Sequence, residues 1–83
     1  MIEARKDIYE AIDRERVYQA QEHLEEPRSV GDWILIIESE LNDAKRCWNK
    51  TGNKRALEEI LQIAAVSVAA IEQHGIEEEH EEN

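Results

Sequence analysis

The stretch that decides the fold reads WILIIESELNDAKRCWNK (33–50), then TGN (51–53), then KRALEEILQIAAVSVAAIEQHG (54–75). Apolar residues recur with helical spacing in the first and last of these runs, and the segment between them is typical of a turn. We therefore expect helices over about residues 30–49 and 54–74. They should fold back on each other as an antiparallel hairpin about Thr51.

Local signals place the ends of these helices. Ser29 is expected to cap the second helix, Gly52 to end it, Asn53 to cap the third helix and Gly75 to end that one. A first helix is expected over residues 3–25, which contain neither Gly nor Pro and precede a proline at position 27. The fold class is thus all-α with three helices around a central hairpin.

The second helix carries two neighbouring stripes with alternating spacings of three and four. One stripe is wholly apolar, is expected to face a neighbouring helix, and consists of Ile34, Ile37, Leu41, Ala44 and Trp48. The other holds two carboxylates and consists of Trp33, Ile36, Glu40, Asp43 and Cys47. Carboxylates among apolar side chains are costly unless they are paired or bind a metal. The alternative is that they lie at the stripe's edge, reaching water or pairing with Lys and Arg.

Counting from the turn brings four oxygen-bearing side chains together. Asp43 and Glu59 each lie eight residues from position 51, and Glu40 and Gln62 each lie eleven residues from it. Within each helix the two members are three apart and share a face. The four side chains are therefore expected to converge between the two helices, and this patch is the candidate site.

Composition bounds the class of protein. The 83 residues carry a net charge of −10, which argues against a nucleic-acid backbone as partner. The single cysteine excludes an intrachain disulfide and fits a reducing, cytoplasmic compartment. The longest mostly apolar run, residues 60–71, is too short to span a bilayer.

The length and the third helix together predict self-association. Residues 60–71 are apolar nearly all round, and one partner helix plus a weakly amphipathic first helix cannot cover them. We expect a homodimer or a dimer of dimers in which a helical bundle is completed by other copies. A single domain is expected over residues 1–76, followed by a solvated, disordered acidic tail over residues 77–83.

Residues 33–44 and 56–66 resemble the MazG-like all-α nucleoside triphosphate pyrophosphohydrolases, most closely their short, phage-type members. The segment ERVYQ (15–19) is similar to one that often precedes the core in those members, so the likeness spans about residues 12–73. The family motif is Glu-Glu-x-x-Glu on one helix and Glu-x-x-Asp on the next. This chain departs from it with Ser39 at the leading acid, Asp43 at the third acid and Gln62 at the last position.

The resemblance implies hydrolysis of a nucleoside triphosphate to a monophosphate and pyrophosphate, with Mg²⁺, or Mn²⁺ in its place, as cofactor. The metal ligands it implies are Glu40, Asp43, Glu59 and Gln62. Glu38 or Glu58 is then expected to act as the base. The groups expected to meet the phosphates are Lys45, Arg46, Lys50, Lys54 and Arg55. Trp33 and Trp48 could stack on the nucleobase, and the alternative for both is packing in the core. The alternative for the cationic residues is that they are ordinary surface charges.

Two other functions stay open. Because of Ser39 and Gln62, the chain could be a catalytically decayed relative that binds a metal or nucleotide, or a purely structural oligomer. An acidic protein that engages a basic partner through its tail is the third alternative.

Overall fold

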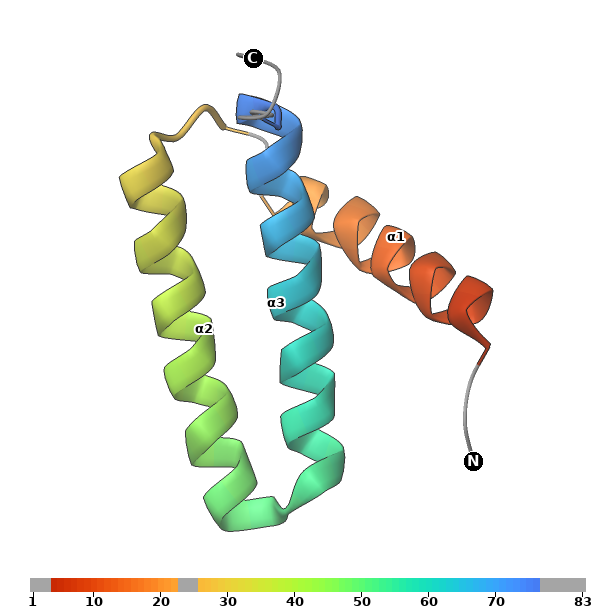
Figure 1. Cartoon of the computed structure of the whole chain (residues 1–83). Coiled ribbons are helices and arrows are strands. Elements are labelled where there is room, and N and C mark those ends of the chain that lie inside the picture. Colours follow the sequence, from red (N-terminus) through yellow and green to blue (C-terminus); the bar gives the residue numbers. More distant parts are fainter. Residues whose placement is uncertain (1–3, 23–25, 77–83) are drawn as a thin grey trace, which may run out of the picture.

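Three helices make up the part of the chain that the computed structural model describes, residues 4–22 and 26–76. They are α1 (Arg5–Gln21), α2 (Val30–Thr51) and α3 (Asn53–His74), and these residues contain no strand, which confirms the all-α class. α2 and α3 lie side by side, joined at Gly52, whereas α1 packs against α3 and not against α2 (Figure 1). None of the three helices is long and apolar enough to cross a membrane. The acidic tail lies outside the described residues.

Most of the expected helix ends are confirmed. The Ser29 hydroxyl accepts a hydrogen bond of 3.0 Å from the backbone N–H of Asp32 and so caps α2. Gly52 and Gly75 end α2 and α3 with φ values of 87° and 80°, in the region that favours glycine. The prediction that Asn53 caps α3 is wrong, because the cap is Gly52 and the Asn53 Oδ1 instead accepts a 3.1 Å hydrogen bond from Trp48 Nε1.

α1 ends earlier than the sequence suggested. Its last helical residue is Gln21, and the backbone N–H of Glu22 bonds to the carbonyl of Gln19 at 2.9 Å. Pro27 therefore does not terminate this helix directly. Residues 23–25, where the helix was expected to continue, lie outside the described part.

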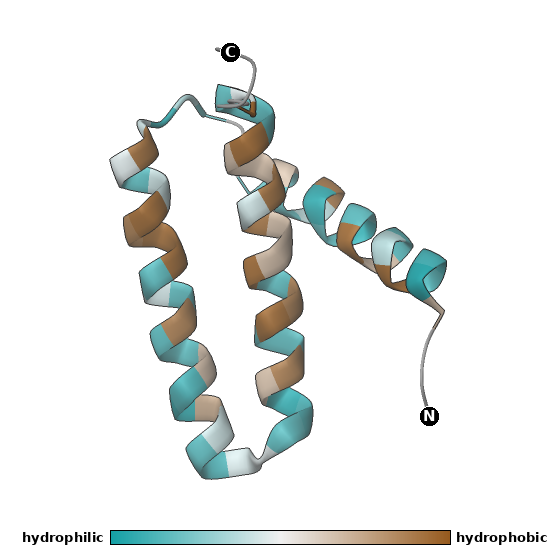
Figure 2. Ribbon diagram, in the orientation of Figure 1, coloured by the Kyte–Doolittle hydropathy of each residue, from teal (hydrophilic) through white to brown (hydrophobic). Residues whose placement is uncertain are grey.

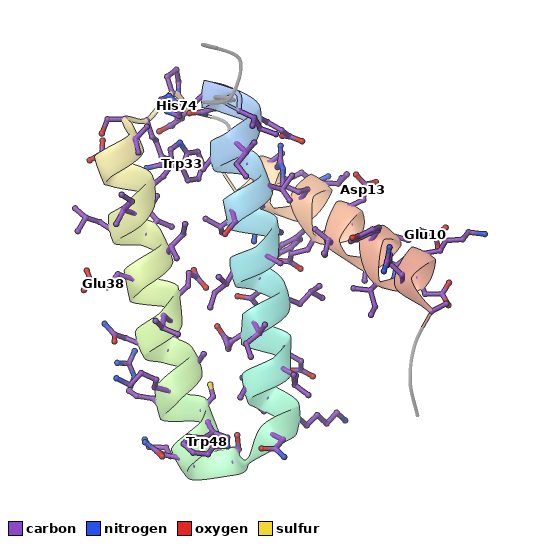
Figure 3. The ribbon with its side chains drawn as sticks, viewed as in Figure 1. Glu10, Asp13, Trp33, Glu38, Trp48 and His74 are labelled. Atoms are coloured by element: carbon purple, nitrogen blue, oxygen red, sulfur yellow. The ribbon has the colours of Figure 1, made fainter. Side chains whose placement is uncertain are left out.

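The core inside one chain is small. Its buried apolar residues are Trp33, Ala44, Ala56, Ala65, Val66 and Ala69, so four of the six are alanines. Trp33 is 1% exposed, lies between α2 and α3, and donates a 3.0 Å hydrogen bond from Nε1 to Oε1 of Gln73 (Figure 3). The Arg28 guanidinium lies 5.7 Å from the centre of its ring. Trp33 and Val66 are thus the only large apolar side chains fully removed from water among the described residues.

Both stripes of α2 contribute to the face that packs on α3. Of the apolar stripe, Ala44 is buried and Ile37 packs against the core, whereas Ile34, Leu41 and Trp48 are exposed. Of the stripe that contains the acids, Trp33 is buried and the other members are half-buried. The apolar stripe is thus only partly covered within the chain, because the face that α3 covers lies between the two stripes.

Candidate functional site

Three carboxylates from two helices meet where the acidic stripe of α2 faces α3. Glu40 and Asp43 lie one turn apart on α2, and Glu59 reaches them from α3. Each offers a carboxylate oxygen that lies within 4.8 Å of the other two, and all three residues are half-buried. The structure therefore brings these three residues together between the helices.

The surroundings of Glu40 disfavour its ionised form. Burial, then the charges of Glu59, Asp43 and Glu15, raise the pKa of the Glu40 carboxyl above its ordinary value of 4.5. Each of these causes disfavours the ionised form of Glu40. A positive charge at the cluster would offset the repulsion among its carboxylates.

Basic side chains border the acids. One pocket of about 330 Å³ is lined by Asp43, Glu59, Arg46, Lys50, Thr51, Arg55 and Cys47. Arg46 forms an ion pair with Asp43, as the alternative interpretation of the acidic stripe anticipated. Arg55 is held on α3 by an ion pair of 3.3 Å with Glu58. Carboxylates and cations thus share one opening between the ends of α2 and α3 nearest the turn.

α1 contributes a part of the site that the sequence reasoning missed. Glu15 lies near enough for its charge to act on Glu40. Gln19 is 6% exposed, and its Nε2 donates to Oε2 of Glu15 at 3.4 Å and to the backbone carbonyl of Gln62 at 3.2 Å. The Glu15–Gln19 spacing of four, which places both on one helix face, was the available signal. Their docking on α3 could not be read from it.

The structure keeps several expected site residues apart from the cluster. Glu38 points away from α3, and Glu58 is exposed and paired with Arg55 (Figure 3). Trp33 is enclosed in the core at the opposite end of α2 from the turn, where its ring cannot stack on a base. Trp48 and Lys45 line a different pocket from the one that contains Asp43 and Glu59.

Of the remaining expected residues, Lys54 is exposed and lines neither pocket. Gln62 is half-buried one turn after Glu59, and its backbone carbonyl accepts the hydrogen bond from Gln19. Arg46, Lys50 and Arg55 are the expected phosphate-binding residues that do line the acidic pocket.

The donor set fits a hard divalent cation. Mg²⁺ takes oxygen ligands at about 2.1 Å in octahedral geometry, so two of its ligands are about 3.0 Å apart when adjacent and about 4.2 Å apart when opposite. The carboxylate oxygens of the cluster, which lie within 4.8 Å of one another, would have to move closer together by side-chain rotation to reach such positions. Three protein ligands would leave further positions for substrate oxygens and for water, which Mg²⁺ usually retains at phosphate sites.

Comparison of the chain with protein-family models, curated proteins and solved structures finds no match. A function for the chain is therefore inferred from the geometry of this cluster and from the motif that its residues form. Both are specific enough to be tested residue by residue.

Proposed function

We propose that this chain is a Mg²⁺-dependent nucleoside triphosphate pyrophosphohydrolase that releases pyrophosphate and a nucleoside monophosphate. The observation that carries the proposal is the meeting of Glu40, Asp43 and Glu59 across α2 and α3. The resemblance of the same residues to the MazG-like motif supplies the reaction class. The cations beside them suit a polyphosphate substrate.

Each residue has a role in this proposal. Glu40, Asp43 and Glu59 would hold the divalent ion, and Mn²⁺ can take its place. The ion, when bound, supplies positive charge against the phosphate oxygens and makes the attacking water more acidic. Lys50 and Arg55, which line the same pocket, would bind phosphate oxygens of the substrate.

Arg46 and Glu58 are the remaining residues to which the proposal gives a role. Arg46 pairs with Asp43 in the free chain and would turn to the phosphates when substrate enters. Glu58 is preferred to Glu38 as the base, because its partner Arg55 lines the pocket whereas Glu38 points away from α3. Water attacks the α-phosphorus, and its proton passes to the Glu58 carboxylate. The bond between the α-phosphorus and the oxygen that bridges it to the β-phosphorus then breaks, which releases pyrophosphate.

The proposed active form is a homo-oligomer, a dimer or a dimer of dimers, in which an α2–α3 hairpin forms half of a helical bundle. Support comes from the thin core of the single chain and from the large apolar side chains that it leaves exposed. The acidic pocket is built within one chain, so each copy would carry its own site.

A catalytically decayed relative is the second candidate, and two observations favour it. The motif lacks acids at Ser39 and Gln62, and an ion pair with Arg46 already engages Asp43. In this alternative the cluster would bind a metal ion or a nucleotide without turnover, or serve only to join the helices.

Pyrophosphate release from a panel of ribo- and deoxyribonucleoside triphosphates, with Mg²⁺ or Mn²⁺, separates these candidates. The proposal expects turnover that chelation abolishes and that Glu59→Gln lowers by at least about 100-fold, since one carboxylate ligand is lost. The matched control is Glu10→Gln on the exposed face of α1, which should keep full activity. Metal-dependent stabilisation without turnover would favour the decayed relative, and neither effect would leave a structural role.

A further inference from the structure

Arg46 connects the two parts of the candidate site. Its guanidinium forms an ion pair with Asp43, one of the three residues of the acidic cluster. It also lines the pocket that holds Lys50 and Arg55. Of these three cationic residues, Arg46 alone is paired with an acid of the cluster in the described part of the chain, since Arg55 pairs with Glu58. The guanidinium therefore already supplies a positive charge at one of the expected metal ligands.

The ion pair lies where it can open. Asp43 and Arg46 are one turn apart on α2, and their side chains are 42% and 66% exposed. Ion pairs with this exposure contribute little to stability, because water solvates both partners when they separate. Figure 2 shows that the ends of α2 and α3 nearest the turn are largely hydrophilic, so polar contacts are at hand for the freed guanidinium. Arg46 is thus held at Asp43 by a contact that a cation of higher charge can replace.

We propose that Arg46 competes with the metal ion for Asp43 in the free chain and binds the triphosphate once the metal ion has displaced it. The inference rests on the proposed function, because it needs both the cation site and the phosphate-binding cations beside it. It adds a coupling between the two. Arg46 opposes the binding of a metal ion by itself and favours the binding of the triphosphate when the metal ion is in place.

Charge decides the competition at Asp43. A divalent ion carries twice the charge of a guanidinium and can contact all three carboxylates of the cluster, whereas Arg46 pairs with one of them. The ion therefore displaces Arg46 at sufficient concentration. It must first break the ion pair and then tolerate a positive charge nearby. Both costs make metal binding weaker than the three carboxylates alone would give.

The released guanidinium suits a phosphate group. Arginine presents parallel N–H donors that match two oxygens of one phosphate. Lys50 and Arg55 line the same pocket, so three positive charges would face the polyphosphate. By linkage, a metal ion that frees Arg46 strengthens triphosphate binding, and the triphosphate strengthens metal binding to the same degree. Substitution of Arg46 should therefore change the two affinities in opposite directions, which a purely structural role would not do.

Binding of Mn²⁺ alone tests the competition at Asp43. Arg46→Gln should lower the Mn²⁺ dissociation constant at least about threefold relative to the wild type, because the competing charge is gone. Arg46→Lys should stay within about twofold of the wild type, since an ammonium group at the same spacing can pair with Asp43. The matched control is Lys50→Gln, which removes the same charge from the same pocket and leaves the Arg46–Asp43 pair in place. It should shift the constant by less than about twofold, because solvent and salt screen an unpaired surface charge.

Binding of a triphosphate analogue tests the phosphate contact. The α,β-methylene analogue of adenosine triphosphate has no oxygen between the α- and β-phosphorus and cannot release pyrophosphate, so calorimetry can measure its affinity at saturating Mn²⁺. Arg46→Gln should raise its dissociation constant at least about threefold. Arg46→Lys should recover part of this loss, since it keeps the charge without the paired donors. Unchanged or weaker Mn²⁺ binding by Arg46→Gln, or two affinities that change in the same direction, would overturn the inference.

These outcomes are separable from those of the proposed hydrolysis. Opposite shifts in the two affinities without pyrophosphate release would support the role of Arg46 and refute only the hydrolysis. Pyrophosphate release with a Mn²⁺ affinity that Arg46→Gln leaves unchanged would refute only the role of Arg46.

Discussion

Replacing Glu40 with Gln should have opposite effects on stability with and without Mg²⁺. Each pair of unit charges 4.8 Å apart repels by about 0.9 kcal/mol in water, and salt at about 0.15 M screens this to about 0.5 kcal/mol. Glu40→Gln removes the repulsion with Glu59 in full and the repulsion with Asp43 in part, because Arg46 is paired with Asp43. The metal-free variant should therefore be more stable by about 0.5–1 kcal/mol, a rise in Tm of about 2–8 °C. Glu15 adds to the effect in the same direction.

The pH dependence has a definite sign. The folded-state pKa of Glu40 is raised above 4.5, so its ionisation destabilises the folded chain at neutral pH. This penalty is complete above the folded pKa and is relieved as the pH falls from there toward 4.5. The advantage of Glu40→Gln at pH 7 should accordingly shrink over that interval.

Mg²⁺ should reverse the order of the two proteins. An ion bound with a Kd of about 1 mM raises the free energy of unfolding by about 1.4 kcal/mol at 10 mM ion. Only the wild type should show the full increase. Thermal unfolding at fixed protein concentration, with and without Mg²⁺, measures both effects, with Glu38→Gln on the exposed side of α2 as the control. A metal-free variant less stable than the wild type, or equal stabilisation of both by Mg²⁺, would refute the reasoning.

Three further substitutions test the fold by urea denaturation. Trp33→Ala should cost about 3–5 kcal/mol, because it empties the centre of a small core; a loss below about 1 kcal/mol would contradict the packing described. Gly52→Ala should cost about 1–3 kcal/mol through strain alone, since φ is 87° and a Cβ there would meet no atom within 4 Å; no loss would mean that the turn has another conformation. Ser29→Ala should cost about 0.5–2 kcal/mol, and Ser29→Asp should restore most of it if the hydroxyl acts as a cap.

Chain-local signals predicted much of the fold. A cap at Ser29 and glycines at positions 52 and 75 fix helix ends through bonds and dihedral angles within a few residues, and these predictions are confirmed. Equal distances from the turn likewise anticipated that Asp43 and Glu59 would come together, because helical rise is nearly constant.

The orientation of the helices depended on contacts that sequence spacing leaves open. Two adjacent stripes of α2 both suited a helix interface, and the face that α3 covers lies between them, with Trp33 from one stripe and Ala44 from the other buried. The place of α1 was also unpredictable, because its amphipathic pattern is weak and its docking uses polar bonds from Gln19. The proximity of Glu15 to Glu40 follows from that docking and from no local pattern.

Binding of Mn²⁺, followed by the loss of its free-ion paramagnetic resonance signal, tests most directly whether Glu40, Asp43 and Glu59 act as one cation site. One ion should bind per chain in the wild type and in Glu38→Gln, excess Mg²⁺ should displace it, and Glu59→Gln should bind it at least tenfold more weakly. Undiminished binding by Glu59→Gln, or no binding by the wild type, would mean that the three carboxylates do not form a cation site.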